Sequence, residues 1–345
     1  MEKIDFVVAW VDGNDSEWQA EKKKWEPLSK GTMDPVANGG CRYRADDVSL
    51  RFCLRSIEKY APWVNRIHFV TCGQKPYWLD ENHPKLNLVN HTDFIPEKYL
   101  PTFNANTIET NFHRIAGLSE RFVFFNDDVC LLQPITKDFF FRNGNPVFAT
   151  DLRYPSMVTY SNWSRLAFND YCLVKNSFDT RKSIWENRSK WFSISKLGLK
   201  RVRQNFLCYL ANKTIPVGTY GHVALPHLKS TLEEVWTRWP DVMGTSSMHK
   251  FRSDEQVNQW LFCAWNQAKG RFYPVHEGGR GEFFDMREDT LDLICETIKR
   301  QSVPQICIND ELKNDTLFET CMRSINNAYH EILPEKSSFE KDEWQ

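Results

Sequence analysis

The run from Phe122 to Val129 constrains the fold more than any other stretch of the chain. Four apolar, strand-favouring residues open it, which predicts a strand buried on both faces, and polar side chains follow at once in Asn126, Asp127 and Asp128. Because ligands of open α/β sheets bind outside the carboxyl ends of strands, these groups suit a divalent cation and a phosphorylated ligand. Taken alone, Asn-Asp-Asp more often marks an ordinary Asx-rich turn.

The composition is that of a globular chain without a basic field. Of the 345 residues, 41% are hydrophobic and 26% are charged, and 44 basic against 45 acidic side chains leave a net charge of −1, so nucleic acid is not an expected partner. The 13 Trp, 24 Phe and 11 Tyr suit a core, sugar stacking or a membrane-facing rim. The length allows one elaborated domain or two closely packed ones.

The cysteines and the start of the chain predict a cytosolic protein. The 10 cysteines, from Cys41 to Cys321, include no Cys-x-x-Cys pair, which argues against structural zinc. The chain begins without a charged-then-apolar leader, and no uncharged run approaches the roughly 18 residues of a membrane span. We therefore expect reduced cysteines that serve mostly as small core residues.

Strand-like and helical patterns alternate over the first part of the chain. Besides the run above, strands are predicted at 4–11, 66–71 and 86–89. Helices are predicted at about 46–61 and 107–116. This alternation predicts βαβ units and an α/β fold with a mostly parallel, Rossmann-like or GT-A-like sheet between flanking helices.

Residues 150–216 differ from the rest because they carry many basic and aromatic side chains with weaker periodicity. We interpret them as a helical insertion that shapes an acceptor site or touches a membrane surface, although such basic faces are usually just solvated. Two further segments are predicted to be irregular: a loop over 27–40, and a charged tail over 334–345 that frays.

Polar residues of the first half suggest ligand contacts. Asp12 and Gly13 follow the first strand, where nucleotide-binding folds place their ligand, although the pattern also fits a plain surface turn. Arg51 and Arg55 lie one helical turn apart and suit either phosphate oxygens or a solvated face. Glu109 stands four residues before a histidine, a spacing that fits a catalytic pair, a metal-binding pair or a surface pair.

The second half supplies histidines and an arginine. His222 and His227 are predicted in a loop ahead of a helix that opens with a capping box at Ser230, where they are either catalytic or structural. Arg252 is predicted just before another helix N-terminus, where it holds a phosphoryl group or makes a cap-region ion pair. Asp310 ends a short apolar strand and so repeats the pattern of the opening run.

Four separated blocks of the sequence carry a family resemblance: Ile4–Asp15, Arg44–Asp128, His222–Trp260 and a block that starts at Cys307. In this order they resemble the Stealth family of sugar-1-phosphate transferases. That family includes bacterial capsular and exopolysaccharide phosphotransferases and the catalytic chain of the animal enzyme that makes the mannose-6-phosphate tag. We do not expect the extra modules of the animal enzyme in this chain.

The resemblance implies one catalytic domain over residues 1–345. Its expected parts are a nucleotide-sugar and metal-binding part, an insertion on the acceptor side, a part with the catalytic histidine and arginine, and a tail: 1–149, 150–216, 217–333 and 334–345.

The resemblance also implies a donor and metal side. Asp127 and Asp128, with Asp310 beside them, would hold Mg²⁺ or Mn²⁺ against the diphosphate of a nucleotide sugar. Further residues would contact the donor: Asp12, Gly13, Arg51, Arg55 and Asn104.

The implied catalytic residues are a histidine, an arginine and a glutamate. His222 or His227 would take the proton of an acceptor hydroxyl, and the spacing in this block is looser than the family pattern, so either histidine remains a candidate. Arg252 would neutralise the phosphoryl oxygens, and Glu109 would complete the metal shell or orient the histidine.

The implied reaction transfers hexose- or N-acetylhexosamine-1-phosphate from a UDP-sugar to a glycan hydroxyl, with release of UMP. By analogy with the bacterial relatives, the acceptor would be lipid-linked and lie at the inner membrane face. A metal-dependent glycosyltransferase that releases UDP is one alternative. A non-catalytic carbohydrate-binding assembly protein is another.

Overall fold

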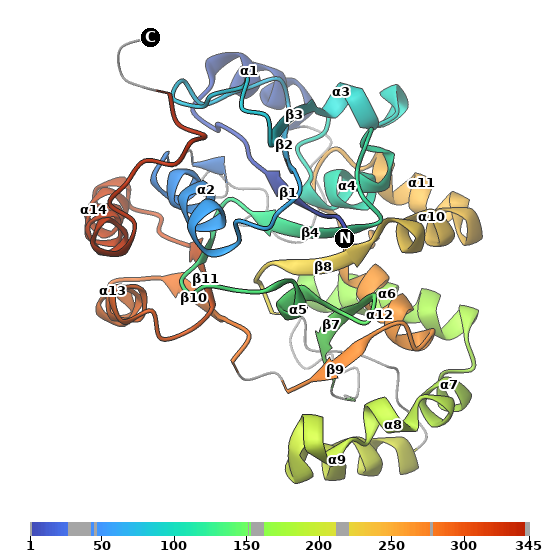
Figure 1. The fold of residues 1–345 in the computed structure, drawn as a ribbon. Helices are drawn as coiled ribbons and strands as arrows, with labels where there is room; N and C mark the ends of the chain where they lie inside the picture. Colours follow the sequence, from blue (N-terminus) through green and yellow to red (C-terminus); the bar gives the residue numbers. More distant parts are fainter. Residues whose placement is uncertain are drawn as a thin grey trace.

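A computed structural model describes residues 2–26, 43–44, 47–150, 152, 162–211, 221–276 and 279–341 (Figure 1). The loop predicted at 27–40 lies outside the described residues. The tail predicted over 334–345 is described as far as residue 341.

The centre of the protein is a five-stranded sheet with the order β3-β2-β1-β4-β8 (Figure 1). The strands are β1 (Ile4–Ala9), β2 (Ile67–Thr71), β3 (Leu86–Asn90), β4 (Arg121–Asn126) and β8 (Leu225–Leu228). All neighbours pair in parallel except β4 and β8, which are antiparallel. This mostly parallel sheet confirms the predicted α/β class.

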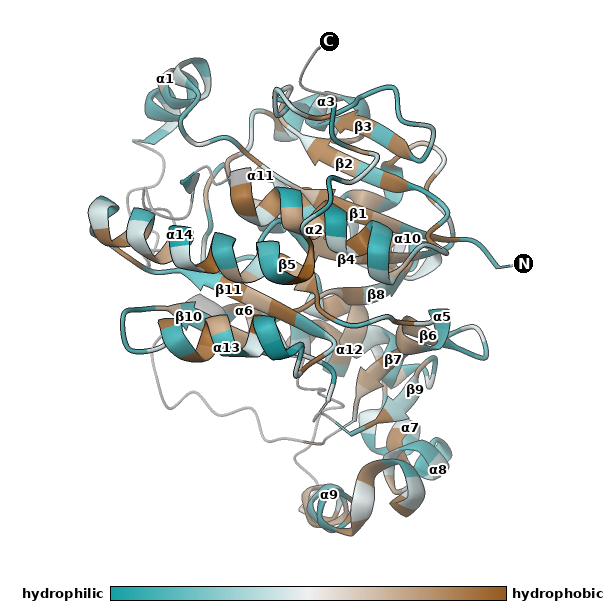
Figure 2. Ribbon diagram, turned by 60° about the vertical axis from the view of Figure 1, so that its left-hand side comes forward, coloured by the Kyte–Doolittle hydropathy of each residue, from teal (hydrophilic) through white to brown (hydrophobic). Residues whose placement is uncertain are grey.

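The central strands are apolar on both faces because each face meets its own core. In β1, Phe6 and Val8 join a core with residues of α2 (Asp47–Tyr60) and α14 (Asp315–Ile332), whereas Val7 belongs to the core on the opposite face. The opposite core contains residues of α10 (Lys229–Arg238) and α12 (Trp260–Ala268). In Figure 2 the central strands are accordingly mostly brown.

Two further sheets of three strands each lie within the described residues. The first pairs β10 (Glu282–Met286) in parallel with β11 (Gln305–Asp310), and β11 with β5 (Val129–Leu131) in antiparallel. The second joins β6 (Phe141–Arg142), β7 (Asn145–Ala149) and β9 (Tyr273–Val275). Because β5 directly follows the turn after β4, the pairing of β11 with β5 places the C-terminal half of β11 close to the end of β4.

The remaining helices flank the sheets. They are α1 (Ser16–Trp25), α3 (His91–Phe94), η3 (Glu97–Tyr99), α4 (Ala105–Thr110), η4 (Phe112–Arg114), α5 (Lys137–Phe140), α11 (Pro240–Met248) and α13 (Leu291–Arg300). The single helix predicted at 107–116 is therefore wrong, because α4 ends at Thr110 and a short 3₁₀ turn follows.

The described residues of the segment 150–216, namely 150, 152 and 162–211, contain four helices. They are α6 (Asn162–Ser177), α7 (Thr180–Glu186), α8 (Arg188–Trp191) and α9 (Ile194–Leu210). Helix α6 packs against α12, whereas α7, α8 and α9 lie at the bottom of Figures 1 and 2, away from the central sheet.

The C-terminal tail does not fray over residues 334–341, so the prediction is wrong for this described part. Phe339 and Glu340 are buried, and the Asp80 amide donates to the Phe339 carbonyl at 2.8 Å. The Lys341 amide likewise donates to the Trp78 carbonyl at 2.7 Å. An aromatic ring and an ion-paired carboxylate in the tail therefore hold it against the domain.

Candidate active site

A cavity of about 260 Å³ lies where the chain leaves β1 and β4. These two strands are neighbours at the centre of the sheet. After β1 the chain forms β2 and β3 on one side of β1, and it then returns to form β4 on the other side. Open α/β sheets bind ligands at such a reversal of strand order. Six of the predicted site residues line this one cavity: Glu109, Asp127, Asp128, His222, Arg252 and Asp310.

Asp127 and Asp128 form the turn between β4 and β5, as the opening run of the sequence predicts. The backbone of Asp128 is held by β11, since the Ile308 amide donates to its carbonyl at 3.2 Å. Burial, together with the nearby charges of Asp128 and Asp127, raises the pKa of the Cys307 thiol well above its usual range. Cys307 is therefore a neutral neighbour of these carboxylates.

Asp310 lies at the end of β11 and forms an ion pair with Arg44, whose Nη1 atom is 2.7 Å from Oδ2. The other carboxylate oxygen accepts a hydrogen bond from the Leu312 amide at 2.9 Å. Arg44 also pairs with Asp315 at 2.7 Å. Both oxygens of Asp310 thus have protein partners. Asp310 is therefore better suited to hold Arg44 in the cavity wall than to bind a metal ion.

Glu109 is a buried carboxylate in α4. Burial raises its pKa to about 7, although the positive charge of Arg252 and the backbone amide of Gln259 act in the opposite direction. A buried carboxyl group with a pKa near neutrality, beside an arginine in a cavity, is typical of a functional site. Of the three interpretations of the Glu109 and His113 pair, the surface pair is therefore wrong, because both side chains are buried.

Arg252 lies in an irregular segment, and α12 does not begin until Trp260. The prediction that Arg252 stands just before a helix N-terminus is therefore wrong. Hydrogen bonds hold this segment instead. The side-chain amide of Asn169 in α6 donates to the Asp254 and Gln256 carbonyls at 2.8 Å each, and the Asn258 amide donates to buried Asp170 at 3.2 Å.

Asn104 anchors the same segment from the other side. It is fully buried, and its amide nitrogen donates to the carbonyls of His249 and Phe251 at 3.0 Å each and to Oε1 of Gln256 at 2.9 Å. Asn104 does not line the cavity, which argues against the predicted contact with the donor. Its hydrogen bonds instead position the segment that carries Arg252.

The structure separates the two candidate histidines. His222 is exposed, lines the cavity and packs against Trp260 and Phe283, with ring centroids 5.6 and 5.2 Å apart. His227 lies inside β8 rather than in a loop, is buried, and does not line the cavity. Burial lowers the pKa of His227 to about 4, against a hydrogen bond with Gln259, so it is a neutral core residue.

The helix after His227 also begins differently from the prediction. Its N-cap is Leu228 and has no side-chain capping bond, so the capping box predicted at Ser230 is wrong. The Ser230 hydroxyl donates instead to Glu120 at 2.6 Å.

Asp12 and Gly13 lie just beyond the end of β1. The Asp12 amide donates to Oε1 of Gln74 at 2.8 Å, and the Gln74 amide nitrogen donates back to the Asp12 carbonyl at 2.9 Å. A Cβ atom on Gly13 would lie 1.5 Å from the Tyr43 carbonyl oxygen, so only glycine fits there. Gly13 lines a second cavity of about 670 Å³, which shares Trp18, Tyr43 and Arg44 with the first.

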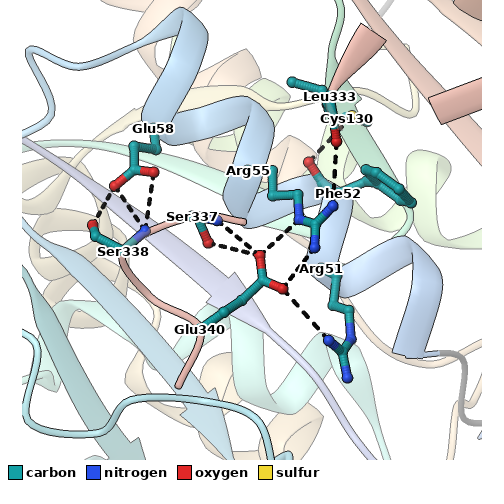
Figure 3. A network of polar contacts seen from close by, with 9 residues as sticks. All are labelled: Arg51, Phe52, Arg55, Glu58, Cys130, Leu333, Ser337, Ser338 and Glu340. Carbon is teal, nitrogen blue, oxygen red and sulfur yellow. Dashed lines mark hydrogen bonds and ion pairs between the residues drawn. The ribbon is translucent and has the colours of Figure 1, made fainter. Parts of the chain in front are cut away.

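Arg51 and Arg55 do not line either cavity. Figure 3 shows both guanidinium groups turned toward Glu340 of the tail. Arg55 is buried, and its Nε and Nη2 atoms donate to the two carboxylate oxygens at 2.7 and 2.8 Å, while Arg51 is 3.4 Å away. The predicted phosphate contacts are therefore wrong, because a carboxylate far along the chain occupies both arginines.

Three residues of the cavity wall had no signal in the sequence that marked them as functional. Trp18, Tyr43 and Arg44 line both cavities. Arg44 belongs to a block of the family resemblance, but its spacing to other polar residues predicts nothing about a site. The pairing with Asp310, 266 positions away, is what places it.

The chemistry of the cavity fits a divalent cation in part. Carboxylate oxygens are suitable ligands for Mg²⁺ and Mn²⁺, and Asp127 and Asp128 both line the cavity. Within the described residues, no three His, Cys, Asp or Glu side chains converge as a ready-made metal cage. Mg²⁺ is often held by one or two carboxylates together with substrate phosphates and water, which is the mode that this pair of aspartates suits.

Sequence comparisons identify the family. The model of Stealth protein conserved region 1 matches residues 2–30, and that of conserved region 2 matches residues 42–148. Capsular polysaccharide phosphotransferase WcwK of Streptococcus pneumoniae is 36% identical over 98% of this chain and 99% of its own length. The chain belongs to the Stealth family. Receptor polysaccharide phosphotransferase WefC of Streptococcus gordonii is 39% identical over 99% of both chains.

Both of these Stealth relatives are named phosphotransferases, and the similarity covers nearly their full lengths. The chain is therefore a transferase enzyme. The two matched regions contain Glu109, Asp127 and Asp128, whereas His222 and Arg252 lie outside them and reach the cavity through the fold. A solved structure of the galactosyltransferase LgtC with donor and acceptor sugar analogues is also similar, with a TM-score of 0.36 and 10% identity over 94% of this chain and 95% of that chain.

Two structural predictions made from composition can be compared with the fold. All nine cysteines among the described residues are free, and six of them are buried. In the described part of the chain, no helix combines the length and the apolar character that a membrane span requires.

Proposed function

We propose that this Stealth protein transfers a sugar-1-phosphate from a UDP-sugar to a hydroxyl of an acceptor glycan. The acceptor oxygen attacks the sugar-proximal phosphorus, the bond from that phosphorus to the bridging oxygen breaks, and UMP leaves with the bridging oxygen. The product is a phosphodiester between two sugars. One observation carries the proposal: Asp128, His222 and Arg252, from three distant segments, line one cavity.

Arg252 would offset the negative charge on the transferred phosphoryl group. Phosphoryl transfer depends mainly on positioning and on electrostatic stabilisation, and an arginine held in place supplies both. The hydrogen bonds from Asn104 and Asn169 to its segment restrain its backbone. We therefore assign these two asparagines as positioning residues for Arg252.

His222 would accept the proton of the acceptor hydroxyl. Among the two candidate histidines it is the one at the cavity, and its exposed position leaves it open to an incoming acceptor. Histidine is the side chain that most often accepts a proton in enzyme catalysis. Glu109 would orient Arg252, since its charge and that of Arg252 influence each other.

Asp127 and Asp128 would hold Mg²⁺ or Mn²⁺ together with the donor diphosphate. When bound, such an ion neutralises charge on the diphosphate oxygens. Asp310 is not included, because its pairing with Arg44 already satisfies it.

The nucleotide would extend from this cavity into the second one. The second cavity is lined by Gly13 next to the end of β1, by the aromatic rings of Trp18 and Tyr43, and by Lys22. Aromatic faces suit a base, and Gly13 permits the close approach of the Tyr43 backbone, which helps to place the Tyr43 ring in the cavity wall. The acceptor would be a lipid-linked glycan at the cytoplasmic face of a bacterial membrane, used for cell-surface polysaccharide.

The test is the identity of the released nucleotide. Purified protein is incubated with a panel of UDP-sugars and other nucleotide sugars, with Mg²⁺ or Mn²⁺ and an oligosaccharide acceptor, and the products are separated by chromatography. Release of UMP with acceptor-dependent phosphodiester formation is expected. Release of UDP would replace the proposal with glycosyl transfer to the anomeric carbon.

A further inference from the structure

Helix α9 exposes most of its large apolar side chains, although Leu197 and Cys208 are buried. Leu199, Leu207 and Leu210 are 69%, 56% and 55% exposed, and Phe206 and Ile194 are exposed as well. From Leu199 onward these residues recur at helical spacing and form one outward stripe. A helix on the surface of a globular protein normally has the reverse arrangement, so this face is built to meet something other than water.

The outward direction of this stripe is fixed by the opposite face of the helix. Asn205 is fully buried and accepts a hydrogen bond from the Leu152 amide at 2.8 Å. Its amide nitrogen donates to the carbonyls of Thr150 at 3.2 Å and Trp191 at 2.8 Å. Because these three bonds hold Asn205 inward, α9 cannot rotate its leucines into the core without leaving buried polar groups unsatisfied.

The charge around the apolar stripe is strongly positive. Residues 180–211 contain eight Lys or Arg and one Asp or Glu, whereas the whole chain has a net charge of −1. Helix α9 itself has no acidic residue and carries Lys196, Lys200, Arg201 and Arg203. On α7, the exposed Trp185 stacks on Tyr209 with ring centroids 5.9 Å apart, which extends the apolar area next to α9.

We propose that α9 docks in the plane of an anionic lipid bilayer, with Leu199, Leu207, Leu210 and Phe206 in the acyl boundary and its basic side chains among the headgroups. Apolar residues flanked by Lys and Arg, in a helix that does not span, match the chemistry of an interfacial membrane helix. Charge complementarity selects an anionic bilayer over a second copy of this chain, since a second copy would bring the same positive charge to the contact.

Docking at a bilayer would bring the enzyme to the lipid-linked acceptor, and this purpose rests on the proposed function. The surface itself consists of the exposed apolar and basic side chains of α9 and of Trp185 on α7. In Figures 1 and 2, α9 lies at one end of the molecule, with α6, α12 and β7 between it and the central sheet. A bilayer held at α9 would therefore leave the catalytic cavity accessible.

The test is co-sedimentation of the full chain with vesicles in 0.1 M NaCl, without donor or acceptor. Binding is expected to vesicles of phosphatidylcholine with 30% phosphatidylglycerol, and little binding to phosphatidylcholine alone. The double variant Leu199→Ser with Leu207→Ser should bind at least about tenfold more weakly, since two apolar side chains are lost from the interface. Lys200→Gln with Arg203→Gln should bind about 20-fold more weakly to anionic vesicles.

The matched control is Leu293→Ser on α13, a leucine that is 54% exposed and lies on a different face. It should bind like the unchanged protein, and all variants should keep their Tm because the substituted side chains face solvent. No binding of the unchanged protein to anionic vesicles would overturn the proposal. A dimer in solution that the Leu199 and Leu207 changes dissociate, without vesicle binding, would assign the face to a second copy instead.

The two proposals fail separately. Loss of vesicle binding with UMP still released to a water-soluble acceptor would refute the membrane surface alone. Vesicle binding together with UDP release would refute the phosphoryl transfer and leave the membrane surface in place.

Discussion

Two buried glutamates beside arginines behave in opposite ways. Glu340 in the tail and Glu109 in the cavity both lie close to a guanidinium group. Burial favours a raised pKa for Glu340, but hydrogen bonds from Arg55 and Ser337 outweigh it, so its pKa is lowered. For Glu109 burial prevails over Arg252, and the pKa rises to about 7.

The difference teaches how to separate a structural ion pair from a site. Around Glu340, Arg55 donates two hydrogen bonds, Ser337 donates two more, and Arg51 pairs at 3.4 Å (Figure 3). Such a carboxylate is fully satisfied and has no capacity left for a ligand. Glu109 lines a cavity and keeps a proton affinity suited to chemistry at neutral pH.

The largest expected effect comes from removing the arginine of the cavity. Arg252→Ala should lower kcat by about 10³-fold or more, because a positioned arginine in phosphoryl transfer contributes on that scale. Nucleotide release measures the rate, and urea unfolding checks that the fold is kept. Arg252→Lys should recover only part of the loss, since lysine cannot contact two oxygens at once. Full activity of Arg252→Ala would remove this residue from the mechanism.

On the structural side of the comparison, Glu340→Ala should destabilise the protein by about 3 to 5 kcal/mol, because it leaves the buried guanidinium of Arg55 without its carboxylate. Urea unfolding measures the change, and kcat per folded molecule should stay near that of the unchanged protein. The double variant Arg55→Met with Glu340→Leu should lose less stability than Glu340→Ala, since it leaves no unpaired buried charge.

The two histidines provide a matched pair. His222→Ala should lower kcat by about 10²-fold, as expected for loss of a proton acceptor, and leave stability nearly unchanged because the ring is exposed. His227→Ala should instead lower stability, because it removes a buried ring stacked on Phe122 and leaves a gap in β8. If His227→Ala loses catalysis at full stability, the assignment of the histidines is reversed.

The last prediction concerns pH. Glu109 has a pKa of about 7 in the folded protein against 4.5 ordinarily. Between these values the folded protein keeps a proton that the unfolded chain has released, so the free energy of unfolding should fall as pH rises from 4.5 to 7, by at most about 3 kcal/mol. Urea unfolding at a series of pH values measures this slope.

Glu109→Gln should remove that slope and be more stable than the unchanged protein at pH 8, while losing activity. A variant that keeps the original pH dependence would show that another group is responsible. Glu340→Gln is the control, because Glu340 affects the free energy of unfolding with the opposite pH dependence. Its lowered pKa contributes stability that is lost as pH falls through the acid range, and the variant should remove that loss.

Local patterns in the sequence predicted the elements that end at the site. The apolar run before Asp127 and the one before Asp310 became β4 and β11, and the alternation of strands and helices predicted the parallel sheet. Such signals are local because a buried strand must be apolar over consecutive residues and because parallel strands need crossover helices. The same reasoning was wrong for the capping box at Ser230 and for the helix start near Arg252. Side chains far along the chain satisfy the backbone there: Glu120 accepts from the Ser230 amide, and Asn169 donates to the Gln256 carbonyl.

Only the tertiary structure decided which polar residues form the site. On the sequence, Arg55 and Arg252 are both arginines near helices, and His222 and His227 are both histidines near a proline. Glu340, 285 positions from Arg55, takes one arginine out of the candidate site, and the pairing of β8 with β4 takes His227 into the core. The role of a charged group or an imidazole depends on the residues that surround it. These residues come from distant parts of the chain, so a local sequence pattern does not reveal them.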